Sequence, residues 1–270
     1  MPTIVVVTCG YRGAGVRVRV PAKINLHLGV GARRGDGYHD LMTVFHSVSL
    51  FDTVTATDAA TTSLLVTGAD AEAVPDGPEN LAWRAADLLA RNHRRRPAAR
   101  LHVDKAIPIS AGLAGGSADA AATLVACDAL WGLHTPRAEL VALAAELGSD
   151  VPFAMTGGTA IGTSRGEILS PLLGGHDPLW WVLALADGGL STPAVYAEFD
   201  RRRAGDPAER DAGLKPPTPL LRALQGEEGN GVADELHNDL QDAALALRPA
   251  LRDTLDAGVL LGAMAGVVSG

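Results

Sequence analysis

Cysteine is scarce in this chain of 270 residues. The two cysteines, Cys9 and Cys127, are spaced neither as a disulfide framework nor as a zinc site. Few cysteines are typical of a protein from a reducing compartment, so we expect a cytoplasmic location. No uncharged apolar run is long enough to span a membrane, and the apolar residues 4–7 are too few for a secretory signal. The sequence therefore predicts no disulfide-stabilised secreted domain and no membrane partner.

Positive charge is also scarce, and lysine especially so. The chain has 23 Lys and Arg against 31 Asp and Glu, which gives a formal net charge of −8. A surface with this balance does not favour binding to nucleic acid. Lysine occurs only at Lys23, Lys105 and Lys215, since arginine supplies most of the positive surface charge. Each lysine is therefore worth testing for a specific role.

The length and composition describe a globular protein with a substantial core. Hydrophobic residues make up 47% of the chain and charged residues 20%. A chain of 270 residues corresponds to one large domain or to two of ordinary size. Apart from a Pro/Gly-rich, charged insertion at 204–219, the sequence shows neither low complexity nor an internal repeat.

The most informative stretch is glycine-rich and leads into an alanine-rich helix. It runs Pro108-Ile-Ser-Ala-Gly-Leu-Ala-Gly-Gly-Ser-Ala-Asp119. Glycines let backbone N–H groups approach a bulky anion, and a helix N-terminus adds unpaired donors, so the stretch is a candidate phosphate cradle. It lacks the lysine of a Walker A loop and the spacing of a dinucleotide-binding fingerprint. A glycine-rich turn before a packed helix remains the structural alternative.

A second candidate lies on a predicted strand near the start of the chain. Residues 16–20 alternate as a strand, Pro21 and Ala22 interrupt it, and residues 23–30 alternate again. Period-2 geometry places Lys23, Asn25 and His27 on the face opposite the apolar side chains. The alternative is an ordinary solvated strand face.

Other elements follow from periodicity and capping signals. Asn80 is a predicted N-cap, and Thr135 and Pro136 are the predicted N-cap and first residue of a later helix. The remaining strands are predicted at 43–50, 53–57, 63–66, 100–104, 157–162 and, buried, at 180–186. Helices are predicted at 80–92, 117–131, 135–147, 192–203, 231–247 and 249–257.

Three motifs in this order resemble those of the GHMP kinases, the family of galactokinase, homoserine kinase and mevalonate kinase. They are Val-Pro-Ala-Lys-Ile-Asn-Leu at 20–26, the glycine-rich stretch, and Gly-Ser-Asp-Val-Pro-Phe at 148–153. Within that family, the first and third motifs together with Gly-Asp-Gly-Tyr-His at 35–39 are most similar to the GHMP kinases that act on 4-diphosphocytidyl-2-C-methyl-D-erythritol. That reaction belongs to the non-mevalonate isoprenoid pathway.

The resemblance implies an α+β fold of two domains. The N-terminal domain, at 16–172, is expected to be like ribosomal protein S5 domain 2, and the C-terminal domain, at 173–270, to be ferredoxin-like. Residues 1–15 form a leader without a family counterpart, expected to be loosely tethered. The chain stops at Ser269-Gly270, inside the family's third glycine-rich motif. We therefore expect the second domain to lack its last strand and helix, which would expose an edge strand and apolar surface.

The resemblance also implies transfer of the ATP γ-phosphoryl group to the acceptor's 2-hydroxyl, with Mg²⁺ as cofactor. Asp150 matches the general base, and Lys23 matches the lysine that stabilises the alkoxide and keeps Asp150 ionised. Ser117 is the candidate Mg²⁺ contact, whereas Asp119 is read as loop support. ATP is expected at Asn80 and Lys105, near adenosine, and at the phosphate loop residues Pro108, Gly112, Leu113, Ala114, Gly115, Gly116, Ser117 and Ala118.

The acceptor is expected to bind through a separate set of side chains. Tyr38 and Tyr196 match two aromatic residues that stack on opposite faces of cytosine, and His39 matches the residue that binds its edge. Asn25 is expected to orient the methylerythritol, and Thr192 lies in the segment that leads to Tyr196. We expect His27 to be structural and Trp180 and Trp181 to belong to the core. The predicted partner is thus a small molecule, and the protein a monomer or homodimer.

Three other functions are weighed against this interpretation. A GHMP kinase of another specificity would have no need of the Tyr38–His39 pair, since a small acceptor without a base offers nothing to stack. A nucleotide-binding protein without catalysis would have no need of both Lys23 and Asp150. A dinucleotide-dependent oxidoreductase lacks any supporting motif spacing.

Overall fold

The protein is described from a computed structural model, which covers residues 5–8, 15–173, 178–186, 188–204, 214–226 and 231–269. Helices and strands are mixed along the chain, as an α+β protein requires. The chain forms two compact units. One contains the described parts of Met1–Lys23, Ser47–Ile109 and Leu113–Gly158; the other contains those of Ile24–His46, Ser110–Gly112 and Thr159–Gly270. The predicted domain boundary near residue 172 stays a prediction.

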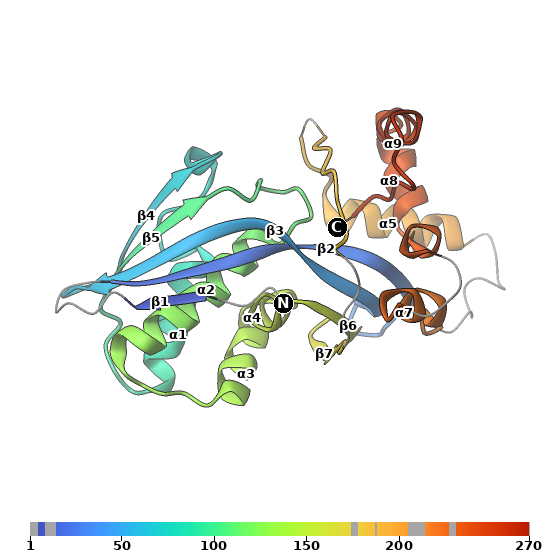
Figure 1. Cartoon of the computed structure of the whole chain (residues 1–270). Coiled ribbons are helices and arrows are strands. Elements are labelled where there is room, and N and C mark those ends of the chain that lie inside the picture. Colours follow the sequence, from blue (N-terminus) through green and yellow to red (C-terminus); the bar gives the residue numbers. More distant parts are fainter. Residues whose placement is uncertain are drawn as a thin grey trace. The chain divides into compact units, whose positions relative to one another are not determined.

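The first unit is a sheet with helices against it. Strands follow the order β1-β2-β3-β5-β4, with β1 at Val5–Thr8, β2 at Val16–Arg33, β3 at His39–Asp58, β4 at Ser63–Gly68 and β5 at Ala99–Lys105. Helices α1 (Leu81–Asn92), α2 (Gly115–Trp131), α3 (Arg137–Leu147) and α4 (Val151–Thr156) pack on one another and lie on one side of this sheet (Figure 1). The short helix η1 is at Ala71–Ala73. Fully buried aliphatic side chains of β2, β5, α1 and α2 form the core.

The second unit uses the other parts of β2 and β3. Strand β6 (Thr159–Ser164) pairs with β3, β7 (Ile168–Pro171) pairs with β6, and β8 (His237–Asn238) runs parallel to β2. The other elements are α5 (Thr192–Arg203), α7 (Thr218–Leu224), η2 (Val232–Glu235), α8 (Gln241–Leu247) and α9 (Ala250–Leu260). Its core joins Leu28 and Val30 of β2 to Val195 and Phe199 of α5 and to α8.

Two predicted interruptions of strands are wrong. Pro21 and Ala22 lie inside β2 and are buried, so the strand continues through them. The expected strands at 43–50 and 53–57 are likewise one strand, β3. From Val20 to Leu26 every residue of β2 is buried, including Lys23 and Asn25. The solvated strand face considered for these side chains is therefore excluded.

Two C-terminal predictions are also wrong. Residues 180–186 form neither helix nor strand, and Trp180 is 93% exposed, so neither the segment nor Trp180 belongs to a core. Apolar residues cannot be buried as a strand without a paired neighbour, and no pairing of this segment occurs among the described residues. The expected helix at 231–247 is divided into η2, β8 and α8, because Asn238 and Asp239 bind the backbone at Leu240 and Val30.

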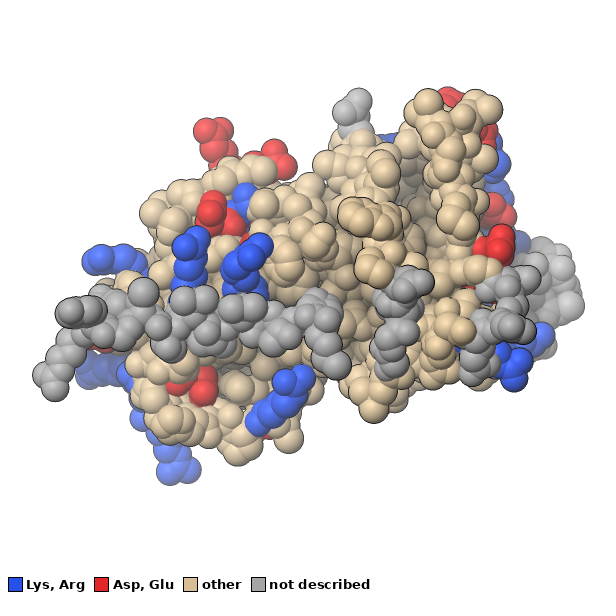
Figure 2. Space-filling view, viewed as in Figure 1, with Lys and Arg blue, Asp and Glu red and all other residues tan. Residues whose placement is uncertain are grey.

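The other helices lie close to where the sequence predicts them. Asn80 caps α1, and α5 begins at Thr192 and ends at Arg203, as expected. Helix α2 begins two residues earlier than predicted, and α3 begins after Pro136 rather than at it. In the predicted leader, Val5–Thr8 pair with β2 instead of being loosely tethered, whereas residues 9–14 lie outside the described part. On the face in Figure 2, basic and acidic side chains are interspersed.

Candidate active site

The glycine-rich stretch forms a bent loop between β5 and α2. Ser110, Gly112 and Ala114 all have positive φ, of 56°, 70° and 58°. Because residues other than glycine rarely adopt this conformation, the loop is tightly constrained at Ser110 and Ala114. Ala114 directly precedes α2, so the bend ends at the helix N-terminus. The first N–H groups of a helix have no partners within it and favour an anion.

The two glycines that begin α2 serve different purposes. A Cβ at Gly115 would lie 3.1 Å from both Ile107 Cγ2 and Lys105 Nζ, which is closer than most real contacts. A Cβ at Gly116 would meet only Leu81 Cδ1, at an ordinary 3.6 Å, and this position is exposed. Close packing therefore favours glycine at position 115. At position 116 the lack of a side chain keeps the N-terminus of α2 accessible. Ser117 is half-buried in the same first turn.

Lys23 lies beside this loop in the first unit. Its backbone N–H donates to the carbonyl oxygen of Leu113 over 3.2 Å, which fixes β2 to the loop. The side chain is only 7% exposed. Burial lowers the pKa of Lys23 below its usual value, and the negative charge of Asp150 opposes this shift. The structure therefore brings together the glycine-rich loop and the two predicted catalytic residues.

Asp150 is positioned by two short turns of the chain. Helix α3 ends at Leu147, Val151 N–H donates to the Gly148 carbonyl over 3.2 Å, and α4 begins at Val151. Asp150 is the residue before α4, yet its side chain does not cap that helix. Its carboxylate can therefore serve another purpose than helix capping. This local fold was not predicted from the sequence, which indicated only a turn after a helix.

Lys105 is in a different setting from Lys23. It ends β5, is buried, and donates from Nζ to Asp52 of β3 and, over 2.7 Å, to Asp119 Oδ2 of α2. Although burial opposes it, the two carboxylates raise the pKa of Lys105. Burial also raises the pKa of Asp119 to about 7, since Lys105 offsets only part of that effect. The expectation that Asp119 supports the loop agrees with these contacts.

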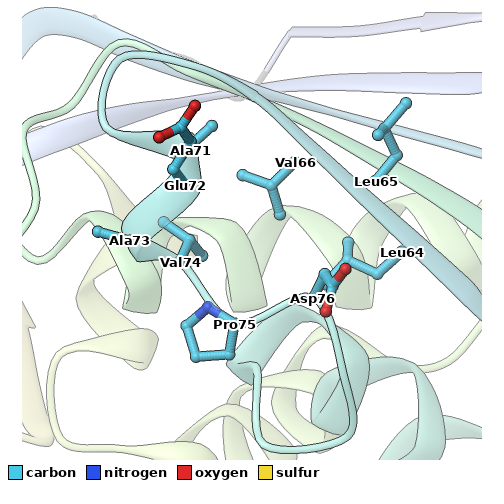
Figure 3. A pocket seen from close by; sticks show the side chains of 9 residues that line it. All are labelled: Leu64, Leu65, Val66, Ala71, Glu72, Ala73, Val74, Pro75 and Asp76. Carbon is cyan, nitrogen blue, oxygen red and sulfur yellow. The ribbon is translucent and has the colours of Figure 1, made fainter.

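Asn80 caps helix α1 and binds a residue that lines a cavity. Its Oδ1 accepts a hydrogen bond from Ala82 N–H over 2.8 Å, and its Nδ2 donates to the Pro75 carbonyl over 2.7 Å. The N-cap alternative for Asn80 is thus present in the structure. A cavity of about 410 Å³ lies next to this turn, between β4, η1 and the residues after η1 (Figure 3). It is lined by Leu64, Leu65, Val66, Ala71, Glu72, Ala73, Val74, Pro75 and Asp76.

In the second unit, Asn25 is held by a chain of hydrogen bonds. Its Nδ2 donates to Thr43 Oγ1 over 2.8 Å, and Thr43 Oγ1 donates to the His27 carbonyl over 2.7 Å. The backbone N–H of Asn25 donates to Ser269 Oγ over 2.9 Å. Asn25 is therefore a fixed side chain rather than a mobile surface group. His27 is half-buried beside His237, and burial lowers its pKa to about 4.

His39 and Tyr196 form an aromatic pair in the same unit. Their ring centroids are 5.1 Å apart and their planes 27° apart, and His39 Nε2 lies 2.9 Å from Asp200 Oδ1. Tyr38 is 56% exposed, with Arg165 over its ring at 5.3 Å. Thr192 is the first residue of α5, one turn before Tyr196. Of the residues predicted to hold cytosine, the contacts join His39 to Tyr196 and leave Tyr38 at the surface.

Sequence reasoning missed three side chains that hold predicted site residues. They are Asp52, which binds Lys105; Thr43, which binds Asn25; and Asp200, which lies against His39. Each stands in an unremarkable strand or helix pattern. Only the buried position of an acidic or hydroxyl residue within an apolar strand could have drawn attention to Asp52 and Thr43.

The remaining observations concern metals and membranes. Within the described ranges, no three His, Cys, Asp or Glu side chains gather as a metal site. The described helices include none that is long and apolar enough to cross a bilayer.

The chain is similar in sequence to known proteins. Residues 80–158 match the model of the GHMP kinases N terminal domain. The chain is 54% identical to 4-diphosphocytidyl-2-C-methyl-D-erythritol kinase of Mycolicibacterium gilvum over 94% of this chain and 79% of the relative. It is 56% identical to the protein of the same name from Salinispora tropica, over 96% of this chain and 82% of the relative.

Solved structures show the same fold. A crystal structure of 4-(cytidine 5'-diphospho)-2C-methyl-D-erythritol kinase matches with a TM-score of 0.67 and 35% identity, over 91% of this chain and 83% of that one. Homoserine kinase from Cytophaga hutchinsonii matches with a TM-score of 0.64 over 98% of this chain and 84% of that one, and at 15% identity it supports the fold alone. The predicted α+β GHMP kinase fold is confirmed. By its sequence and its fold, the chain belongs to the 4-diphosphocytidyl-2-C-methyl-D-erythritol kinase family of the GHMP kinases.

Proposed function

We propose that this chain transfers the γ-phosphoryl group of ATP to the 2-hydroxyl of 4-diphosphocytidyl-2-C-methyl-D-erythritol. The observation that carries the proposal is the position of buried Lys23, whose charge interacts with Asp150 and whose N–H binds the glycine-rich loop. Family membership at more than half identity gives the acceptor. Phosphoryl transfer asks mainly for positioning and charge neutralisation, which such a site supplies.

Asp150 and Lys23 have different roles in the phosphoryl transfer. A tertiary alcohol is a poor nucleophile at neutral pH, so its proton must leave as the bond to phosphorus forms. Asp150 accepts that proton, and the Lys23 ammonium stabilises the oxygen as its negative charge develops. Lys23 must be protonated for this role. Because burial lowers its pKa, we expect the activity to decline on the alkaline side at a lower pH than for an exposed lysine.

The glycine-rich loop and the cavity between β4 and η1 bind ATP in this proposal. The N–H groups from Gly112 to Ala118 receive the phosphates, and the cavity beside Asn80 receives the adenosine. Adenosine is uncharged, so its amino and hydroxyl groups can donate to Glu72 and Asp76 at the cavity wall.

Mg²⁺ usually binds through substrate phosphates with few protein ligands. This fits a site where Ser117 is the candidate protein contact for the ion. The ion would neutralise phosphate charge.

The second unit binds the acceptor. Asn25 orients the methylerythritol, and His39, Tyr38 and Tyr196 recognise the cytosine. His39 is held by Asp200 and stacked on Tyr196, so its ring is ordered before the acceptor arrives.

The proposal also includes the oligomeric state, monomer or homodimer, and a cytoplasmic location. Cys127 is a buried free thiol, in keeping with a reducing compartment.

The proposal is tested by ADP release from Mg-ATP with four separate acceptors. These are 4-diphosphocytidyl-2-C-methyl-D-erythritol, mevalonate, homoserine and galactose. We expect turnover with the first alone. Asp150→Asn should lower kcat by about a hundredfold or more, since proton removal by a positioned base contributes at least that much. Binding of ADP to this variant should stay near that of the wild type.

Asp253→Asn is the matched control, because Asp253 is exposed on α9. It should retain full turnover. Turnover with mevalonate or homoserine but not with the cytidylated acceptor would overturn the substrate assignment. Near-normal kcat in Asp150→Asn would remove Asp150 as the base while leaving the substrate assignment in place.

A further inference from the structure

A buried cluster of three charged side chains lies beneath the glycine-rich loop. Lys105 Nζ donates to Asp52 Oδ2 and, over 2.7 Å, to Asp119 Oδ2. The side chains of all three are at most 5% exposed. Asp119 Oδ1 is also buried and has no hydrogen-bond partner among the described residues. Burying three charged side chains costs free energy, so the presence of this cluster in the fold needs an explanation.

The cluster contacts the chain on both sides of the loop. Asp52 Oδ1 accepts hydrogen bonds from the backbone N–H groups of Ala106, over 2.6 Å, and Ile107, over 2.8 Å. These residues lead directly into the loop at Pro108. Asp119 lies in α2, a few residues after the loop ends. One ammonium group thus connects the start of the loop, through Asp52, to its end, through Asp119.

The geometry leaves the ammonium group poorly placed to contact a nucleotide. Lys105 is 5% exposed, and its Nζ is directed to two carboxylates. Nζ also lies where a Cβ of Gly115 would come within 3.1 Å, so the backbone at Gly115 covers it. A glycine at 115 is therefore needed for the first turn of α2 to approach Lys105 closely.

We propose that Lys105 is a positioning residue which, together with Asp52, fixes both ends of the phosphate loop and acts on ATP only through that loop. This inference rests on the proposed function of the loop as the phosphate site. It assigns Asp52 a role in nucleotide binding, although Asp52 is fully buried. It also replaces the direct contact with the nucleotide that the sequence suggested for Lys105.

The test compares Asp52→Asn, Lys105→Met and the double variant. Equilibrium binding of ADP and the KM values for ATP and for the acceptor are measured for each. Both single variants should weaken ADP binding by about tenfold or more, equivalent to about 1.4 kcal/mol. Because the two residues act as one unit, the double variant should lose no more than the weaker-binding single variant. The acceptor KM should change less than about twofold.

Lys215→Met is the control, because Lys215 is an exposed lysine outside the cluster. It should bind ADP as the wild type does. ADP binding by Asp52→Asn at wild-type strength, with loss only in Lys105→Met, would overturn the inference in favour of direct contact. So would losses that add in the double variant, or an acceptor KM that rises as much as that for ATP.

Thermal unfolding shows whether each variant is folded at the assay temperature. Where Lys105→Met is not, Lys105→Arg replaces it, since it keeps the charge but changes the geometry, and it too should weaken ADP binding. ADP binding is measured without acceptor. A wild type that turns over none of the acceptors, while Asp52→Asn still loses ADP, would refute the proposed function and leave the role of the cluster standing.

Discussion

At the scale of single residues, Thr43 is a buried group that holds Asn25, the side chain proposed to orient the acceptor. It is fully buried, and its hydroxyl accepts a hydrogen bond from Asn25 Nδ2 and donates one to the His27 carbonyl. Thr43→Val keeps the shape but removes an acceptor from the buried amide, a loss that costs about 1–3 kcal/mol. We expect a severalfold rise in the acceptor KM, measured by steady-state kinetics, with the KM for ATP unchanged.

Thr43→Ser is the matched control, because it retains the hydroxyl group. It should preserve the acceptor KM within about twofold, apart from the effect of the missing methyl group. Equal losses in the two variants would mean that packing, and not the hydrogen bond, positions Asn25. A rise in the KM for ATP of the same size would point to general damage of the fold.

The sequence predicted the residues that we propose to act on ligands but not the side chains that hold them in place. Lys23, Asn25 and Asp150 stand in recognisable local motifs, so their candidacy follows from short stretches of sequence. Asp52 and Lys105 are separated by 53 residues, and His39 and Asp200 by 161. No periodicity carries information over such separations. The supporting contacts depend on which strands and helices become neighbours, and that is decided by the whole fold.

At the scale of elements, amphipathic helices were predictable and long strands were not. Helix α1 follows from its Asn80 cap and its apolar periodicity, and α5 has the predicted bounds. Strand β2 passes through Pro21 because the rest of the strand keeps its neighbours, whereas local rules treat proline as an interruption. Residues 180–186 have the composition of a buried strand but pair with none of the described strands, and Trp180 is exposed. The composition of a segment gives its tendency to form a strand, and pairing with a neighbouring strand decides whether the strand forms.

The elements around the cavity allow a test of where adenosine binds. Val74 follows η1 and lies in the cavity wall (Figure 3). Val74→Phe should fill part of the cavity of about 410 Å³ and raise the KM for ATP about tenfold, without affecting the acceptor KM. Val259→Phe, at an exposed position on α9, is the control for adding an aromatic ring. Unchanged kinetics for Val74→Phe would place adenosine outside this cavity.

At the scale of the whole molecule, the buried charges of the first unit make stability depend on pH in two directions. Burial lowers the pKa of Lys23, so the unfolded chain holds this proton at a higher pH than the folded one does. Stability therefore rises with pH in the alkaline range, between the lowered value and the usual one. Burial raises the pKa of Asp119, which gives the opposite slope on the acid side. Groups proposed for catalysis and loop support thus reduce stability near neutral pH.

Asp119→Asn isolates the acid-side effect, because asparagine does not titrate and can still accept a hydrogen bond from Lys105. Asp119 has a pKa of about 7 when folded and 3.8 as its ordinary value, so between these pH values the folded protein holds a proton that the unfolded chain has released. The free energy of unfolding of the wild type should therefore fall relative to the variant as pH rises from 5 to 7, by at most about 1.4 kcal/mol per pH unit. Urea unfolding at pH 5, 6 and 7 measures this difference. A constant difference across the three values would mean that Lys105 keeps Asp119 ionised throughout in spite of the nearby Asp52, and that the cluster is held as a net anion beneath the phosphate loop.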